Sequence, residues 1–317
     1  GMDRAESLAR LQYGSVTRLA ELPGTVALYP THGAGSFCTS SVAETSASTI
    51  RNERQSNPVL AHRTVESFVH DALTELQPYP DYYAYMGPIN LAGPEPLPDL
   101  TAPHITVDEI PAQAHVIDIR PQADYAAGHL PGSHGLEFED QMGVWAGWLL
   151  PFDHPIVLVA NPNQNTTAAT VQLARIGYDH VLGIVTDLQD RNDLDRYRLA
   201  SVADLAAEIE FASPQILDVR APGDWKTSSI PGSLHRYVPD LRTGLPEDLD
   251  PTKPVWIICG GGYRSQMAVR YVEAGGFTPI VVTGGGSQRC WPEIRSSSCR
   301  VPQCSRQPRR PLDRRSS

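Results

Sequence analysis

Cysteine is scarce in this sequence, and its pattern excludes two kinds of architecture. The 317 residues include five cysteines, an odd number, and no two of them have the CxxC spacing of a redox or metal-binding pair. Neither a disulfide framework nor a structural zinc site is therefore expected. Cys259 differs from the others because it stands between a hydrophobic run and a glycine-rich turn.

Long apolar runs and positive charge are also lacking. No stretch approaches the roughly 20 apolar residues of a membrane span, and the N-terminus has no apolar signal core, so we expect a cytoplasmic protein with no membrane partner. Of the net charge of −10, residues 295–317 contribute +6, with seven Arg and one Asp. The acidic remainder indicates no nucleic-acid partner, and the Arg-, Ser- and Pro-rich residues 295–317 are predicted to be a disordered tail.

An internal repeat organises the rest of the chain. "HVIDIRPQADYAAGHLPGS" from His115 returns as "QILDVRAPGDWKTSSIPGS" from Gln215, and "PIVLVANPNQNTTAAT" from Pro155 returns as "PVWIICGGGYRSQMAV" from Pro254. Two copies of one domain therefore follow each other, and we place them at residues 101–195 and 196–294.

Each copy alternates short apolar runs with helical patterns. The predicted strands are 116–119, 156–159 and 181–185 in the first copy and 216–219, 255–258 and 280–282 in the second, with helices near 167–176 and 265–274. Apolar strands separated by helices are typical of parallel sheets covered on both faces. The predicted fold class is α/β.

Cys259 directly follows a predicted strand. In parallel sheets of this kind, ligands bind beyond the carboxyl ends of the strands. The glycines after it allow backbone N–H groups to turn toward the sulfur, and the following helix directs its positive end there, which favours a thiolate. A buried structural cysteine is the alternative, but it would need neither three glycines nor a nearby arginine. We therefore predict that Cys259 is a nucleophile and that the residues after it bind an anionic substrate. These substrate-binding residues are Gly260, Gly261, Gly262, Tyr263, Arg264 and Ser265.

The loop "CGGGYRS" resembles the active-site loop of rhodaneses (sulfurtransferases), and "DVRAPGDW", "IPGS" and "VVTGG" resemble the stretches around it. The resemblance implies that Cys259 takes sulfur from a small anionic donor such as thiosulfate or a persulfide. It then passes the sulfur to a thiol or cyanide, without a cofactor. Phosphatases related to this fold place five or more residues between cysteine and arginine, whereas this loop has four. A non-catalytic scaffold or redox sensor is the second alternative.

The first copy keeps the loop length but not its chemistry, since Ala160 and Asn165 align with Cys259 and Arg264. We predict that this copy is catalytically silent and has a structural or regulatory role, like the inactive half of tandem rhodaneses. The repeated acid–arginine pairs are expected to be internal ion pairs rather than catalysts. They are Asp118 with Arg120 and Asp218 with Arg220.

Residues 1–100 lie outside the repeat. "VALYPTHGAGSFC" and the stretches after it resemble the C-terminal part of metallo-β-lactamase-fold hydrolases, of the persulfide dioxygenase type fused to rhodaneses. The resemblance implies a partial α+β domain in which His32 is a remnant of a metal motif. No HxHxDH run precedes His32, and a metal centre needs three or more ligands, so no metal is expected here. We expect the chain to start inside an ancestral domain, and this segment to form a homodimer or to be partly disordered.

Overall fold

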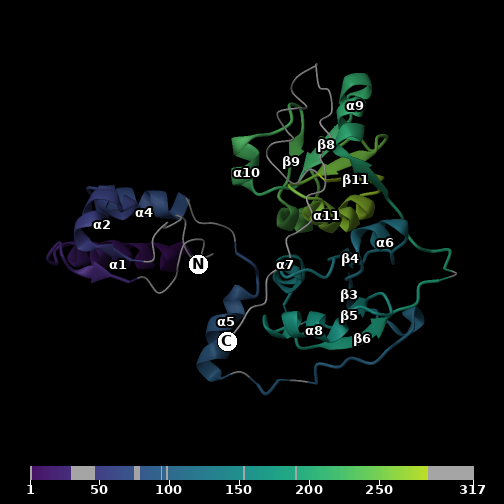
Figure 1. The fold of residues 1–317 in the computed structure, drawn as a ribbon, viewed down its shortest axis with the longest axis horizontal. Helices are drawn as coiled ribbons and strands as arrows, with labels where there is room; N and C mark the ends of the chain where they lie inside the picture. Colours follow the sequence, from purple (N-terminus) through teal and green to yellow (C-terminus); the bar gives the residue numbers. More distant parts are fainter. Residues whose placement is uncertain are drawn as a thin grey trace, which may run out of the picture. The chain divides into compact units, whose positions relative to one another are not determined.

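The computed structural model describes residues 2–284 apart from 30–46, 75–78, 94, 98, 153 and 190. His32 and the predicted tail at 295–317 lie outside the described residues. The chain forms two compact units, Gly1–Tyr79 and Pro80–Ser317. Figure 1 shows the elements of both.

The first unit is mainly helical. Its elements are α1 (Met2–Ala20), β1 (Ala27–Leu28), β2 (Ser48–Thr49), α2 (Ile50–Ser56), α3 (Pro58–Ala61) and α4 (Val65–Thr74). The two short strands pair in antiparallel fashion. Ala9 of α1 packs on Phe68 and Val69 of α4 in a small apolar cluster. Strand β1, which lies in the stretch "VALYPTHGAGSFC", is only two residues long.

The first repeat copy is a four-stranded parallel sheet in the order β4-β3-β5-β6. Its elements, with the helix that precedes it, are α5 (Tyr83–Ala92), η1 (Val107–Glu109), β3 (His115–Asp118), α6 (Gln122–Ala127), β4 (His134–Gly135), α7 (Met142–Leu149), β5 (Ile156–Val159), α8 (Thr166–Ala174) and β6 (Val181–Val185). The sequence of β5 is IVLV, and all four residues are buried. A strand that is buried on both faces shows this continuous apolar run.

The second copy repeats the arrangement and adds a strand, in the order β7-β11-β10-β8-β9 with every pair parallel. Its elements are β7 (Arg198–Ser201), α9 (Val202–Ala212), β8 (Gln215–Asp218), α10 (Pro222–Thr227), β9 (Leu234–His235), η2 (Val238–Thr243), β10 (Val255–Ile258), α11 (Tyr263–Ala274) and β11 (Pro279–Thr283). The predicted strands and helices of both copies are confirmed to within two residues. The α/β fold class with two copies of one domain is confirmed as well.

Helix α11 joins the two copies. It packs on β10 and β11 of its own sheet and also contacts β4 of the first copy, so in Figure 1 it lies between the second sheet and the elements β4 and α7. One continuous apolar cluster contains side chains of both copies, among them Tyr125 and Met267. The two sheets are therefore held together by a shared core. Among the described residues, no helix combines the length and apolarity that crossing a membrane requires.

Candidate active site

Cys259 comes directly after β10, at the carboxyl end of the second sheet, and 3% of the residue is exposed. The backbone N–H of Gly262 donates a hydrogen bond to its Sγ at 3.0 Å. Gly262 also caps α11, a twelve-residue helix, so the positive end of the helix dipole lies at the sulfur. Both features stabilise negative charge on Sγ relative to a thiol in an apolar core.

Glycine is required at one loop position by backbone geometry. Gly262 has φ +96°, in the left-handed region, and a β-carbon there would lie 3.4 Å from the side chain of Gln122. Gly261 has nothing within 4 Å of a virtual β-carbon, and at Gly260 the nearest atom is Arg264 Nη2 at 3.3 Å. The loop therefore turns at Gly262, and this turn presents the amide to the thiol.

Arg264 lies beside the loop and is already paired. Its Nη1 is 3.3 Å from Oδ2 of Asp224, on α10, and the two side chains are 23% and 40% exposed. Burial raises the pKa of the neighbouring Tyr237, and the charge of Arg264 opposes that shift, which places this phenol close to the guanidinium. Arg264 is therefore held in place by a carboxylate that an anionic substrate would have to share or replace.

Two other loop residues point elsewhere. The Tyr263 hydroxyl donates to the backbone oxygen of Glu137 in the first copy, at 3.1 Å. Ser265 is fully buried in α11, and its hydroxyl has no hydrogen-bond partner among the described residues. Of the residues singled out from sequence, Gly262 contacts the sulfur of Cys259, and Arg264 lies beside Gly260 in the same loop. The structure directs Tyr263 to the neighbouring domain.

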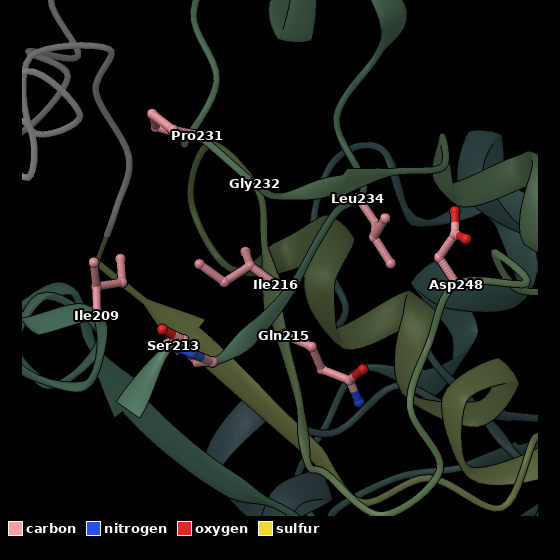
Figure 2. Close-up of a pocket in the computed structure, with 9 residues that line it drawn as sticks. Ile209, Ser213, Gln215, Ile216, Pro231, Gly232, Leu234 and Asp248 are labelled. Atoms are coloured by element: carbon pink, nitrogen blue, oxygen red, sulfur yellow. The ribbon is translucent and has the colours of Figure 1, made fainter. Parts of the chain in front are cut away.

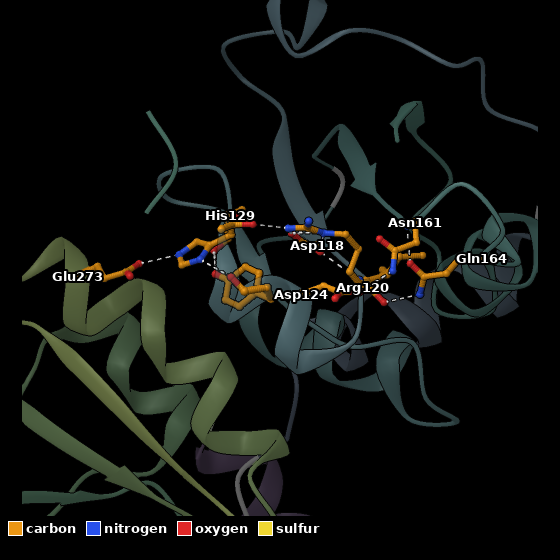
Figure 3. A network of polar contacts seen from close by, with 11 residues as sticks. Asp118, Arg120, Asp124, His129, Asn161, Gln164 and Glu273 are labelled. Atoms are coloured by element: carbon orange, nitrogen blue, oxygen red, sulfur yellow. Dashed lines mark hydrogen bonds and ion pairs between the residues drawn. The ribbon is translucent and has the colours of Figure 1, made fainter. Parts of the chain in front are cut away.

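The equivalent loop of the first copy is closed by amide side chains (Figure 3). Asn161 donates to Asp124 at 2.6 Å, and Gln164 donates to the backbone oxygen of Ile119 at 2.9 Å. Asp124 is the counterpart of Asp224, so the carboxylate that holds Arg264 in one copy holds Asn161 in the other. Ala160 replaces the thiol and is buried. The first copy therefore has neither nucleophile nor cation at this position.

The repeated acid–arginine pairs are internal braces, as predicted. Arg120 and Arg220 each contact the preceding aspartate, Asp118 or Asp218, at 2.6 Å, and both carboxylates are fully buried. Each guanidinium also donates to a backbone oxygen eight residues further on. These pairs fix the strand end to the loop that follows the next helix.

An acidic groove of about 400 Å³ borders the active-site loop. It is lined by Gln122, Glu137, Glu139, Asp140 and Gln141 of the first copy and by Gly261 and Tyr263 of the loop. Burial, together with the charges of Glu139 and Asp124, raises the pKa of Glu137. The first copy thus contributes a carboxylate-rich wall next to the loop.

A second cavity of about 440 Å³ lies at the opposite end of the second sheet (Figure 2). Gln215, the first residue of β8, lines it together with Leu234 and Ile209, whereas Cys259 follows the last residue of the parallel strand β10. Among its lining residues Asp248 is the one acid. This cavity is therefore remote from the thiol.

Three residues near the loop were not predicted from sequence. Gln122 donates to the backbone oxygen of Gly262 at 3.0 Å, Asp224 pairs with Arg264, and Glu137 lines the groove. Asp224 belongs to the repeat and could have been suspected for that reason. The two residues of the first copy give no sequence signal, because they approach the loop only through domain packing.

Comparison with known proteins agrees with this geometry. The profile of the rhodanese-like domain matches residues 106–186 and 201–289, which together make up more than half of the chain. A rhodanese-like domain protein from Staphylococcus aureus is 26% identical, over 30% of this chain and 90% of that one, with a TM-score of 0.27. A thiosulfate sulfurtransferase from Pseudomonas aeruginosa is 19% identical, over 61% and 39%, with a TM-score of 0.24.

A metallo-β-lactamase structure from Staphylococcus aureus is 25% identical, with a TM-score of 0.46. It is matched over 56% of this chain, which spans half of its length. The family itself rests on the two profile matches, and both fall on the repeat described above. The chain belongs to the rhodanese-like domain family and carries two copies of that domain, the second of which retains a cysteine at the sheet end.

Proposed function

We propose that the protein is a sulfurtransferase in which Cys259 carries sulfur as a persulfide. The thiolate attacks the outer sulfur of a donor, either thiosulfate, which leaves as sulfite, or a persulfide, which leaves as a thiolate. The new S–S bond on Cys259 is then attacked by a thiol or cyanide, which takes the outer sulfur and restores the thiolate. Electrons and charge balance in both steps without a cofactor.

One observation carries this proposal: Cys259 Sγ accepts the Gly262 amide at the N-terminus of α11, with Arg264 beside the same loop. A structural cysteine has no need of a left-handed glycine that donates to it. The same amide and helix end would stabilise the anionic outer sulfur of a persulfide.

The acidic groove favours a donor of low charge. Three carboxylates face the groove beside the loop, and Asp224 already neutralises Arg264. A thiosulfate dianion would meet more repulsion there than a persulfide, whose reacting group carries at most one negative charge. We therefore propose a persulfide as the preferred donor. We propose in addition that the first unit derives from a persulfide dioxygenase-like, metallo-β-lactamase-fold domain. A cytoplasmic, dimeric protein is part of the same proposal.

The direct test is incubation of the protein with glutathione persulfide or thiosulfate, followed by mass spectrometry of the Cys259 peptide. One added sulfur atom on Cys259, lost on addition of cyanide or a thiol, supports the proposal. Turnover that survives Cys259→Ser would reject it. A non-catalytic redox sensor, the second candidate, would show oxidation of Cys259 by peroxide but no sulfur transfer to an acceptor.

A further inference from the structure

Three side chains from separate segments meet at the junction of the two rhodanese-like domains. His129 follows α6 in the first domain, Asp195 lies in the segment before β7, and Glu273 lies in the last turn of α11. One ligand atom from each lies within 4.8 Å of the other two. Figure 3 shows Glu273 reaching from α11 toward the His129 ring.

The backbone fixes two of these residues in advance. His129 and Asp195 form a bridge in which each N–H donates to the other's carbonyl oxygen, at 3.0 and 2.9 Å. The His129 ring is fully buried and stacks on Tyr125, with ring centroids 3.9 Å apart. Its orientation is therefore set by packing.

The hydrogen bonds of the His129 ring do not account for the carboxylate that faces it. Nδ1 lies 2.9 Å from the backbone oxygen of Tyr125, which can only accept, so Nδ1 carries a hydrogen. In a neutral ring, Nε2 would then direct a lone pair at the Glu273 carboxylate, 3.1 Å away. Asp195 adds a second carboxylate to the same small volume. A proton held between Nε2 and the Glu273 carboxylate, or a metal cation bound by all three side chains, would remove this repulsion.

A buried hydroxyl beside the site lacks a partner. Tyr197 packs edge-on against His129, is 8% exposed, and its hydroxyl oxygen has no hydrogen bond among the described residues. A water molecule bound to a cation at this site would offer the hydroxyl a partner.

We propose that His129, Asp195 and Glu273 form a binding site for a divalent transition-metal cation, of the Zn²⁺ type, that links the two domains. Imidazole nitrogen with two carboxylates suits Zn²⁺ better than Mg²⁺ or Ca²⁺, which prefer all-oxygen shells. Three protein ligands leave a fourth tetrahedral position for water. A histidine whose other nitrogen donates to a backbone carbonyl is the usual arrangement around a metal.

The test uses the full chain with Cys259→Ser and the four other cysteines alkylated, which removes thiols as competing zinc ligands and makes the result independent of sulfur transfer. Zn²⁺ is titrated calorimetrically against this protein, its melting temperature is recorded with and without Zn²⁺, and Co²⁺ substitution is followed by visible absorption. We expect one bound ion, a higher melting temperature and a Co²⁺ spectrum.

Asp195→Asn is the decisive variant, because a simple His129–Glu273 ion pair does not require Asp195. Loss of a ligand should weaken Zn²⁺ binding by at least the roughly 10- to 100-fold seen when an outer-shell partner is removed. Asp193→Asn, two residues away and 58% exposed, is the matched control and should bind as before. Zn²⁺ binding unchanged in Asp195→Asn, or no binding by the parent protein, would overturn the proposal in favour of an imidazolium–carboxylate pair.

Discussion

The side-chain amide of Gln122, in the first rhodanese-like domain, donates a hydrogen bond to the backbone oxygen of Gly262, in the Cys259 loop of the second, at 3.0 Å. Gly262 is also the residue whose N–H contacts the thiol. The first domain therefore contacts the residue that positions the Cys259 thiol, although it has alanine, Ala160, at the equivalent place.

Gln122→Ala should slow sulfur loading of Cys259 without unfolding the protein. A partly buried hydrogen bond contributes about 0.5–1.5 kcal/mol, which corresponds to a loss of roughly two- to tenfold in kcat/KM if it holds the loop in its reactive shape. Single-turnover loading with a persulfide donor measures this. Gln189→Ala, an exposed glutamine of the same domain, should retain the full rate.

Gly262→Ala should abolish most of the loading, while Gly261→Ala should lower it much less. A left-handed conformation costs a residue with a β-carbon roughly 1–2 kcal/mol, and φ at Gly262 is +96°. The loop would relax by turning the amide away from Sγ. Gly261 has no positive φ and open space around it, so it is the matched control. Equal rates in the two variants would contradict the role given to the amide.

Asp224→Asn should increase the affinity for an anionic donor. The change releases Arg264 from a pair of 3.3 Å and removes a negative charge next to the loop. We expect a severalfold rise in kcat/KM for thiosulfate, largest at low ionic strength because salt screens exposed charges. Asp124→Asn, the same change in the first copy, should leave kcat/KM for thiosulfate unaltered.

Arg220→Ala should be the most destabilising of these variants. It would leave the carboxylate of Asp218 buried without its ion-pair partner at 2.6 Å. Breaking a buried pair in this way costs about 3–5 kcal/mol, whereas removing an exposed pair costs at most about 1 kcal/mol. Chemical denaturation of Arg220→Ala beside Arg191→Ala, whose partner Asp193 is exposed, measures the difference.

Acidification below neutrality should destabilise the interface between the domains. Burial, with the charges of Arg270 and His115, lowers the pKa of His134 well below its ordinary value of 6.5. Because the pKa of His134 is lower in the folded than in the unfolded chain, the unfolded chain takes up the proton first as the pH falls. The contribution of neutral His134 to the free energy of unfolding is therefore complete above pH 6.5 and is lost below it. Urea unfolding between pH 5 and about 8 tests this. His134→Gln should show a flatter profile.

The sequence predicted the fold in detail where the pattern was local. Runs such as IVLV at 156–159 and VWII at 255–258 are wholly buried and became strands with the predicted bounds. The strand β7 was missed because RLAS has little apolar content and only its Ala200 is buried. Periodicity does not reveal an edge strand of this kind.

The site could be predicted only in part, for a related reason. Cys259, its glycines and Arg264 are close in sequence, so spacing alone indicated their association. The Gln122–Gly262 and His129–Glu273 contacts each join residues more than a hundred positions apart. Both depend on how α11 packs against the first copy. No local pattern encodes that packing.

The length of α11 has a consequence for any attempt to shorten the protein. One end of this helix supports the reactive sulfur, and the other end carries Arg270 and Glu273, which contact His134 and His129 of the neighbouring domain. Separating the two domains would expose this side of α11 to solvent. It would also remove the contacts that hold the helix, and with it the Cys259 thiol, in place. The proposed sulfur transfer therefore depends on both domains, and the second domain alone should load sulfur on Cys259 more slowly than the two together.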